Sequence, residues 1–192
     1  ILVEAMSDLA RDRIGALVVL QGEQPLRRHV RGGIEMGAKL SVPLLKSIFD
    51  PHSPGHDGAV IVENGRIALF AAHLPLSTDF QQLAGVGTRH SAALGLAELT
   101  DALCLVVSEE RGRISVAKDG TLTTLRDANE LARVLAAEFA ARQPERSFRR
   151  TVRQLLFANW FARLASLAIV LGMWLLFVPG GRPAEQVLKM PV

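Results

Sequence analysis

The first third of the chain alternates between helix-like and strand-like patterns of apolar residues. Apolar residues recur at helical spacing over residues 2–13, and an unbroken apolar run, residues 14–20, follows with the character of a buried strand. After a loose, glycine-containing stretch, Ser41 and Pro43 are typical of a helix start. This amphipathic helix is predicted to end before Pro51. The pattern therefore predicts an α/β unit.

The middle of the chain carries the clearest hairpin and one further helix. Two apolar runs within residues 59–77 meet at Asn64 and Gly65, a pair that readily adopts the positive φ angles of a tight type I′ turn. The Ala- and Leu-rich stretch after Gly87 predicts a helix.

Two strand-like runs and a last helix follow. Asp119 and Gly120 predict a turn after the second run, and a helix over residues 127–142 is predicted with Asp127 as its cap and Glu130 three positions later. Because strands and helices interleave without a repeat, we predict one α/β domain, residues 1–142, with a mixed central β-sheet flanked by helices.

The C-terminal part differs in kind from this domain. As a helix, the apolar residues 155–178 would span roughly 36 Å, against a hydrocarbon core of about 30 Å. Arg163 interrupts the run and would have to reach the headgroups from the first turns. An amphipathic or core helix of a soluble domain is the alternative, but residues 164–178 have no polar face. We therefore expect one C-terminal transmembrane helix.

Charge predicts the orientation of this helix. The arginine-rich residues 143–154 form a basic juxtamembrane linker, whereas the only basic residues in 179–192 are Arg182 and Lys189. The positive-inside rule then predicts a single-pass protein of the cell membrane with its folded domain in the cytoplasm and residues 179–192 starting an extracytoplasmic segment.

Composition adds three points. A chain of 192 residues that is 49% hydrophobic and 21% charged is globular rather than disordered. The net charge of +3 is concentrated in the linker, which favours a membrane surface and predicts no nucleic-acid partner. The single cysteine, Cys104, has no partner for a disulfide within the chain, which favours a reducing compartment.

Two polar groups interrupt the apolar elements. His56 and Asp57 stand before Gly58 and Ala59 at a loop–strand junction, where a carboxylate beside an imidazole can hold a divalent metal or take a proton. A turn with a capping aspartate is the alternative interpretation. A His-Asp phosphohydrolase is disfavoured, because the further His and Asp ligands that it needs on several helices are not in the sequence.

The second group, residues 88–91, lies at the predicted helix start. Free N–H groups there favour phosphate oxygens, and Arg89 adds a forked cation. A Thr88 cap with solvated Arg89 and His90 is the alternative. The chain has neither the Rossmann glycine pattern nor a P-loop, so a nucleotide site here must be of another type.

These groups lie within two longer stretches that carry a family resemblance, "HDGAVIVENGRIALFAAHLPLS" and "GTRHSAALGLAELTDALCLVVSEERGRISVAKDGTL". Over residues 1–142 the chain closely resembles the diadenylate cyclase (DAC) domain, in its membrane-bound CdaA type. The resemblance implies condensation of two ATP into cyclic di-AMP and two pyrophosphates, with a divalent metal, Mn²⁺ or Mg²⁺, by a face-to-face homodimer.

The resemblance also implies roles for particular residues. Asp57 would help to activate the ribose 3′-hydroxyl and hold the metal, with His56 as a second metal ligand. Arg89 would be a catalytic residue that binds the triphosphate, and Leu74 would lie against adenine. The other implied ATP-binding residues are Gly58 and Ala59 at the sugar and phosphates, Thr88, His90 and Ser91 at the triphosphate, and Ser108 and Glu110 near the phosphates and metal.

Ser91 departs from the family pattern, which is Arg-His-Arg where this chain has Arg-His-Ser. Loss of one charge-assisted phosphate contact removes about 1.5–3 kcal/mol, roughly ten- to a hundredfold in binding or rate. Arg111 or Arg113 could restore the charge. Two functions stay open: an active membrane-tethered cyclase, and a catalytically degenerate nucleotide-binding sensor or regulatory module at the membrane.

The apolar segment has a resemblance of its own. "LFANWFARLASLAIVLGMWLLFV" is similar to the membrane anchor that begins YbbR-domain proteins, which regulate CdaA-type cyclases. A fusion of a cyclase with a YbbR-type regulator, seen here as a fragment with further sequence before residue 1, would explain this order of parts. A cyclase with only a tail anchor is the simpler alternative.

Overall fold

The computed structural model describes residues 1–142 and 168–174. Within them, one sheet has the strand order β2-β4-β3-β1-β5-β6-β7. Its strands are β1 (Ala16–Leu20), β2 (Arg31–Lys39), β3 (Ala59–Glu63), β4 (Arg66–His73), β5 (Leu103–Val107), β6 (Ile114–Lys118) and β7 (Thr121–Thr124). Strands β1 and β3 are parallel and all other neighbours are antiparallel, so the predicted mixed sheet is confirmed.

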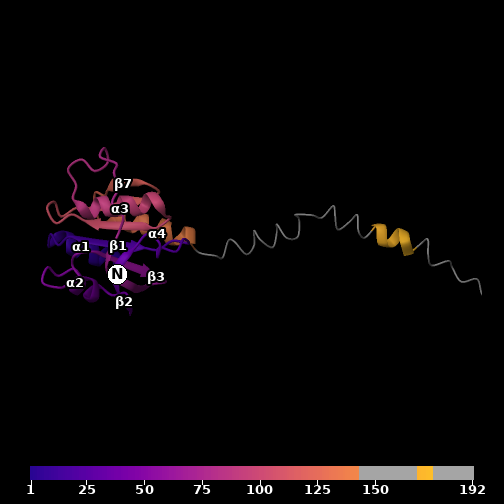
Figure 1. Ribbon diagram of the computed structural model, residues 1–192, viewed down its shortest axis with the longest axis horizontal. Helices are drawn as coiled ribbons and strands as arrows, with labels where there is room; N and C mark the ends of the chain where they lie inside the picture. The colour runs from indigo at the N-terminus through magenta and orange to yellow at the C-terminus, as the bar shows by residue number, and fades with distance from the viewer. Residues whose placement is uncertain (143–167, 175–192) are drawn as a thin grey trace, which may run out of the picture. The chain divides into compact units, whose positions relative to one another are not determined.

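Helices cover both faces of this sheet, as predicted. They are α1 (Leu2–Arg11), α2 (Val42–Ile48), α3 (Thr88–Leu99) and α4 (Ala128–Arg142). Figure 1 shows α3 on one side of the sheet, and α1 and α2 on the other. Two separate apolar clusters form the core, one under α3 and one under α1, α2 and α4.

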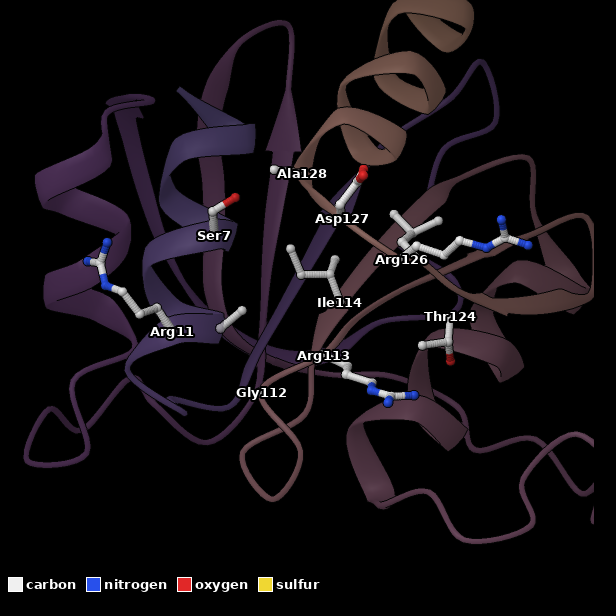
Figure 2. A pocket seen from close by; sticks show the side chains of 11 residues that line it. Ser7, Arg11, Gly112, Arg113, Ile114, Thr124, Arg126, Asp127 and Ala128 are labelled. Atoms are coloured by element: carbon white, nitrogen blue, oxygen red, sulfur yellow. The ribbon is translucent and has the colours of Figure 1, made fainter.

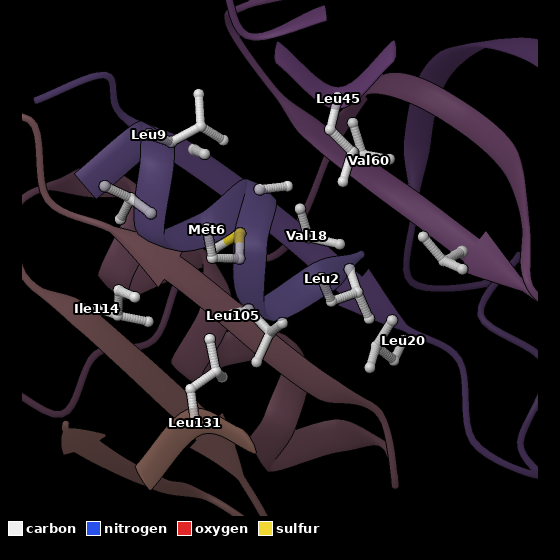
Figure 3. Packing of buried hydrophobic residues seen from close by; sticks show 14 of the residues in the cluster. Leu2, Met6, Leu9, Val18, Leu20, Leu45, Val60, Leu105, Ile114 and Leu131 are labelled. Carbon is white, nitrogen blue, oxygen red and sulfur yellow. The ribbon is translucent and has the colours of Figure 1, made fainter. Parts of the chain in front are cut away.

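The central strand β1 contributes to both clusters because successive side chains of a strand point to opposite faces. Leu17 and Val19 belong to the cluster under α3, and Val18 and Leu20 to the other. Figure 3 shows the second cluster, in which side chains of α1 such as Met6 pack over β1 and β5. Coverage on both faces explains why β1 is an unbroken apolar run and does not alternate.

Local predictions are largely confirmed, with differences at the ends of elements. The hairpin turn has φ of 51° at Asn64 and 74° at Gly65, as a type I′ turn requires. Helix α1 ends at Arg11, earlier than predicted, because Arg13 takes a positive φ of 54°.

Helix α4 begins with only half of the predicted reciprocal cap. The N–H of Glu130 donates to Oδ1 of Asp127 at 2.8 Å, as expected. The Glu130 carboxylate, however, accepts from the N–H of Arg126 at 2.8 Å, one residue before the cap.

The predicted membrane segment lies mostly outside the described residues. The linker, residues 143–154, and residues 179–192 are not described, and of the span 155–178 only residues 168–174 are, as helix. Across the described parts of the chain, no helix is long and apolar enough to cross a membrane. Five side chains of the described helical stretch are more than half exposed: Ile169, Val170, Leu171, Met173 and Trp174.

Candidate functional site

The start of α3 and the end of β5 meet in a small hollow of about 60 Å³, lined by Gly87, Thr88, Arg89, His90, Val107, Ser108, Glu109 and Glu110. Gly87 is the N-cap of α3 without a side-chain cap, so the alternative interpretation of Thr88 as the cap is wrong. The N–H groups of Thr88 and Arg89 have no acceptor among the described residues. This helix end therefore offers free donors and a partial positive charge to an anion.

Arg89 connects three segments at this hollow. Its Nη1 lies 2.8 Å from Oε2 of Glu109, and its Nη2 donates to the carbonyl of His56 at 3.3 Å. Its Nε–H is buried and has no acceptor among the described residues. The guanidinium is thus held by the loop before β3 and by the turn after β5, with one hydrogen bond unmet.

His90 has a different environment from the other residues of the hollow. It is only 4% exposed, and burial first, then the charge of Arg111, lowers its pKa below the ordinary value of 6.5. The imidazole is therefore neutral at pH 7, where it can donate a hydrogen bond but adds no positive charge.

A pH-dependent stability should follow from this lowered pKa. Below about pH 6.5 the unfolded chain binds a proton at His90 before the folded chain does, so the free energy of unfolding should fall as the pH drops from 7.5 to 5.5. In His90→Gln this fall should be smaller. Urea unfolding of both proteins at the two pH values measures it. Equal falls would show that His90 does not titrate differently in the two states.

The loop before β3 brings the second predicted group to Arg89. Nδ1 of His56 donates to the carbonyl of Ser53 at 2.6 Å, because a carbonyl can only accept, so Nε2 is the ring nitrogen that could bind a cation. Asp57 is exposed, and its carboxylate accepts no hydrogen bond from the described residues.

The two residues after Asp57 are small for different reasons. Gly58 has a φ of 143° and a side chain there would lie 2.7 Å from the backbone of Ala71, so only glycine fits. Ala59 is fully buried in β3, beneath the site.

The donor set suits a cation that is held partly by its substrate. The described residues contain no group of three or more His, Cys, Asp or Glu side chains that could enclose a metal. Mg²⁺ and Mn²⁺ sites with bound nucleotides typically need only one or two protein donors, because phosphate oxygens and water complete the shell. His56 and Asp57 fit that limited role.

Six predicted site residues do not line this hollow. Four of them belong to the loop before β3 and to its first residue, as described above, and the other two, Ser91 and Leu74, lie elsewhere. Oγ of Ser91 donates to the carbonyl of Ser77 at 3.1 Å, and the carbonyl of Ser91 accepts from the N–H of Ser77 at 3.0 Å. Ser91 therefore holds the segment after β4 and does not line the hollow. Leu74 lines another hollow, of about 340 Å³, with Arg28, His29, Arg31, His73 and Pro75.

Sequence reasoning missed two residues that shape the site. Glu109 is the partner of Arg89, but the pair of glutamates after Ser108 does not reveal which one turns toward Arg89. Gly15 is the other: a side chain there would lie 2.5 Å from Nη1 of Arg89 and 2.7 Å from Oε2 of Glu109. The sequence gives no signal for Gly15, because its contacts are distant along the chain.

Comparisons with known proteins identify the family of this chain. The profile of a family described as DisA bacterial checkpoint controller nucleotide-binding matches residues 3–122. Cyclic di-AMP synthase CdaA of Bacillus subtilis is 43% identical over 138 residues, which cover 72% of this chain and 50% of that protein. A diadenylate cyclase of Listeria monocytogenes is 43% identical over 130 residues, which cover 68% of this chain and 48% of that protein.

The solved structures agree with the fold. The crystal structure of a double mutant of DacA from Staphylococcus aureus is 40% identical in sequence, with a TM-score of 0.68 over 71% of this chain and 91% of that chain. The chain spans about half the length of the two curated relatives above. With a family profile matched over most of its folded domain, the chain belongs to the diadenylate cyclase (DAC) family of DisA-type nucleotide-binding domains.

Proposed function

We propose that this chain is a diadenylate cyclase, which condenses two ATP into cyclic di-AMP and two pyrophosphates. The observation that carries the proposal is Arg89, which joins the free helix N-terminus of α3 to the loop of Asp57. This contact ties the donors for a triphosphate to the loop that carries Asp57, whose carboxylate can take a proton. The names of the relatives at 43% identity support the same reaction.

The chemistry needs positioning and charge more than a covalent nucleophile. The ribose 3′ oxygen of each ATP forms a bond to the α-phosphorus of the other, and the bond from that phosphorus to pyrophosphate breaks. Asp57 accepts the 3′-hydroxyl proton, while Arg89 and the N–H groups of α3 hold the phosphates. A divalent cation, Mn²⁺ or Mg²⁺, would be held by Asp57 and His56 and would neutralise phosphate charge.

The size of the hollow supports a homodimer in which two domains face each other. Pockets that bury a small molecule usually measure about 300–1,000 Å³, whereas the hollow at Arg89 measures about 60 Å³. This hollow therefore encloses only part of a nucleotide. A second domain carrying its own ATP would cover the rest and supply the other 3′-hydroxyl.

A single-pass membrane anchor at residues 155–178, with the cyclase domain in the cytoplasm, is part of the proposal. Its support is the apolar sequence, the basic linker before it, and the exposed apolar side chains of residues 168–174. A YbbR-type regulator, fused after the anchor or separate, is the partner that the resemblance of this segment suggests.

A nucleotide sensor without turnover is the second candidate. Two observations favour it: Glu109 already neutralises Arg89, and Ser91 adds no contact to the hollow. Incubation of the full chain with ATP and Mn²⁺ or Mg²⁺, followed by chromatography, separates the two functions. Cyclic di-AMP supports the cyclase, whereas ATP binding without product supports the sensor.

Gly15→Ala should impair this site without unfolding the domain. The new methyl group would collide with the ends of the Arg89 and Glu109 side chains, which can move, and not with backbone. We expect cyclic di-AMP formation to fall roughly tenfold or more, because even a small misplacement of a charged group is costly in phosphoryl transfer. The melting temperature should change little. Ala16→Gly, a change at the next residue and the first of β1, is the control because it adds no atom near the pair. Unchanged activity of Gly15→Ala would mean that the pair has no role.

A further inference from the structure

The family pattern places its phosphate-binding cations at positions 89–91, and in this chain none of these positions offers an unpaired positive charge. Arg89 is paired with Glu109, His90 is buried, and Ser91 is bound to Ser77. ATP brings three to four negative charges, so the question is which other side chain could face them. The turn between β5 and β6 supplies one.

This turn is held in a fixed conformation. The N–H of Ser108 donates to the carbonyl of Arg113 at 3.0 Å, and the N–H of Gly112 donates back to the carbonyl of Ser108 at 2.8 Å. The N–H of Arg111 donates to Oγ of Ser108 at 3.3 Å. Gly112 has a φ of 59° and lies so close to α1 that a side chain would come within 2.6 Å of the carbonyl of Ala10. The direction in which Arg111 leaves the turn is therefore set.

The Arg111 side chain reaches the segment that leads into α3. Its Nη2 lies 3.2 Å from the point where a Cβ would stand if residue 85 were not glycine. Gly85 is two residues before the N-cap Gly87. It is close enough to His90 for its charge to contribute to the lowered pKa of that residue. Arg111 is exposed and has no ion-pair partner within the described part of the chain. An uncommitted cation thus stands beside the open helix end.

We propose that Arg111 binds the triphosphate of ATP and supplies the positive charge that Ser91 does not. Arg111 belongs to the same turn as Ser108 and Glu110, so it stands beside the hollow at Arg89 on a fixed support. Its guanidinium can form paired hydrogen bonds to phosphate oxygens, as can Arg89. The identity of the ligand as ATP rests on the proposed function.

Arg113, the other arginine near Glu110, lies elsewhere. It lines a separate groove of about 620 Å³ between α1, β6, β7 and the start of α4, together with Thr124, Arg126 and Asp127 (Figure 2). This groove is larger than the hollow at Arg89, but it holds none of the residues of the candidate site. Arg113 carries the same charge two positions away and is the matched control.

The test compares Arg111→Gln with Arg113→Gln in the full chain, using ATP and adenosine as probes in calorimetry. We expect Arg111→Gln to weaken ATP binding about tenfold, as for loss of one charge-assisted contact, and to leave adenosine binding unchanged. Arg111→Lys should recover part of the loss. Arg113→Gln should bind both probes like the unmodified chain. In the cyclase assay, KM for ATP should rise more than kcat falls.

The outcomes separate this inference from the proposed function. Unchanged ATP binding by Arg111→Gln, equal losses in the two Gln variants, or a parallel loss of adenosine binding would each overturn the role of Arg111. If the unmodified chain binds ATP but forms no cyclic di-AMP, the cyclase proposal fails while the binding data still decide on Arg111. No ATP binding at all by the unmodified chain would overturn both.

Discussion

Asp57→Asn is expected to lower cyclic di-AMP formation by about a thousandfold or more and to leave ATP affinity within about tenfold. The carboxamide keeps the size of the side chain, but it neither accepts a proton well nor holds a divalent cation as a carboxylate does. The fold should not change, because Asp57 is exposed and its side chain accepts no hydrogen bond from the described residues. Product chromatography and calorimetry with ATP measure the two quantities.

Asp119→Asn is the control for this change. Asp119 is also an exposed aspartate, it lies in the turn between β6 and β7 with a φ of 48°, and asparagine tolerates that conformation well. It should behave like the unmodified chain. If Asp57→Asn retains normal turnover, Asp57 is not the group that takes the proton.

Specific activity of residues 1–142 is expected to rise with protein concentration. Residues 1–138 form a compact unit with both apolar clusters, so this part is expected to fold alone. Cyclisation needs two ATP on two domains, and an interface made largely of nucleotides and polar loops is weak. Below the dissociation constant of the dimer, each tenfold dilution should lower specific activity about tenfold. The full chain in vesicles should stay active at such dilutions, because an anchor raises its effective concentration.

Mixed dimers provide a second measurement on the same assembly. Asp57→Asn mixed with Arg89→Ala should not recover full activity, since two bonds must form and no mixed dimer has two intact halves. A specific activity that stays constant down to nanomolar concentration, with a monomeric mass in the presence of ATP, would rule out the dimer. The sensor would then be the better account of this chain.

The sequence alone was sufficient to predict most of the local structure. The type I′ turn at Asn64 and Gly65, the buried strand β1 and the helix that opens after Gly87 follow from φ preferences and from the periodicity of apolar residues. These are properties of neighbouring residues, so no tertiary contact is needed to predict them. The meeting of Thr88, Arg89 and His90 at a helix mouth was predictable for the same reason.

The environment of Ser91 was not predictable in this way. Its neighbours in sequence suggest a phosphate contact, yet each residue of an α-helix turns by about 100° from the last, so position 91 points about 200° away from position 89. That direction meets Ser77, on the segment after β4. Only the packing of that segment on α3 decides what Ser91 does.

The partners of Arg89 likewise depend on long-range pairing. Antiparallel β1 and β5 pair Ala16 with Val107, which brings Gly15 to the end of β5, where the turn with Glu109 begins. The glycine leaves the space that the Arg89–Glu109 pair fills. The local sequence alone determined that a helix begins after Gly87 and which polar residues stand at its start. The tertiary structure decided three things: that Glu109 and not Glu110 pairs with Arg89, that residue 15 must be glycine, and that Arg111 approaches α3. The reason is that strand register and turn packing set side-chain directions that no local pattern encodes.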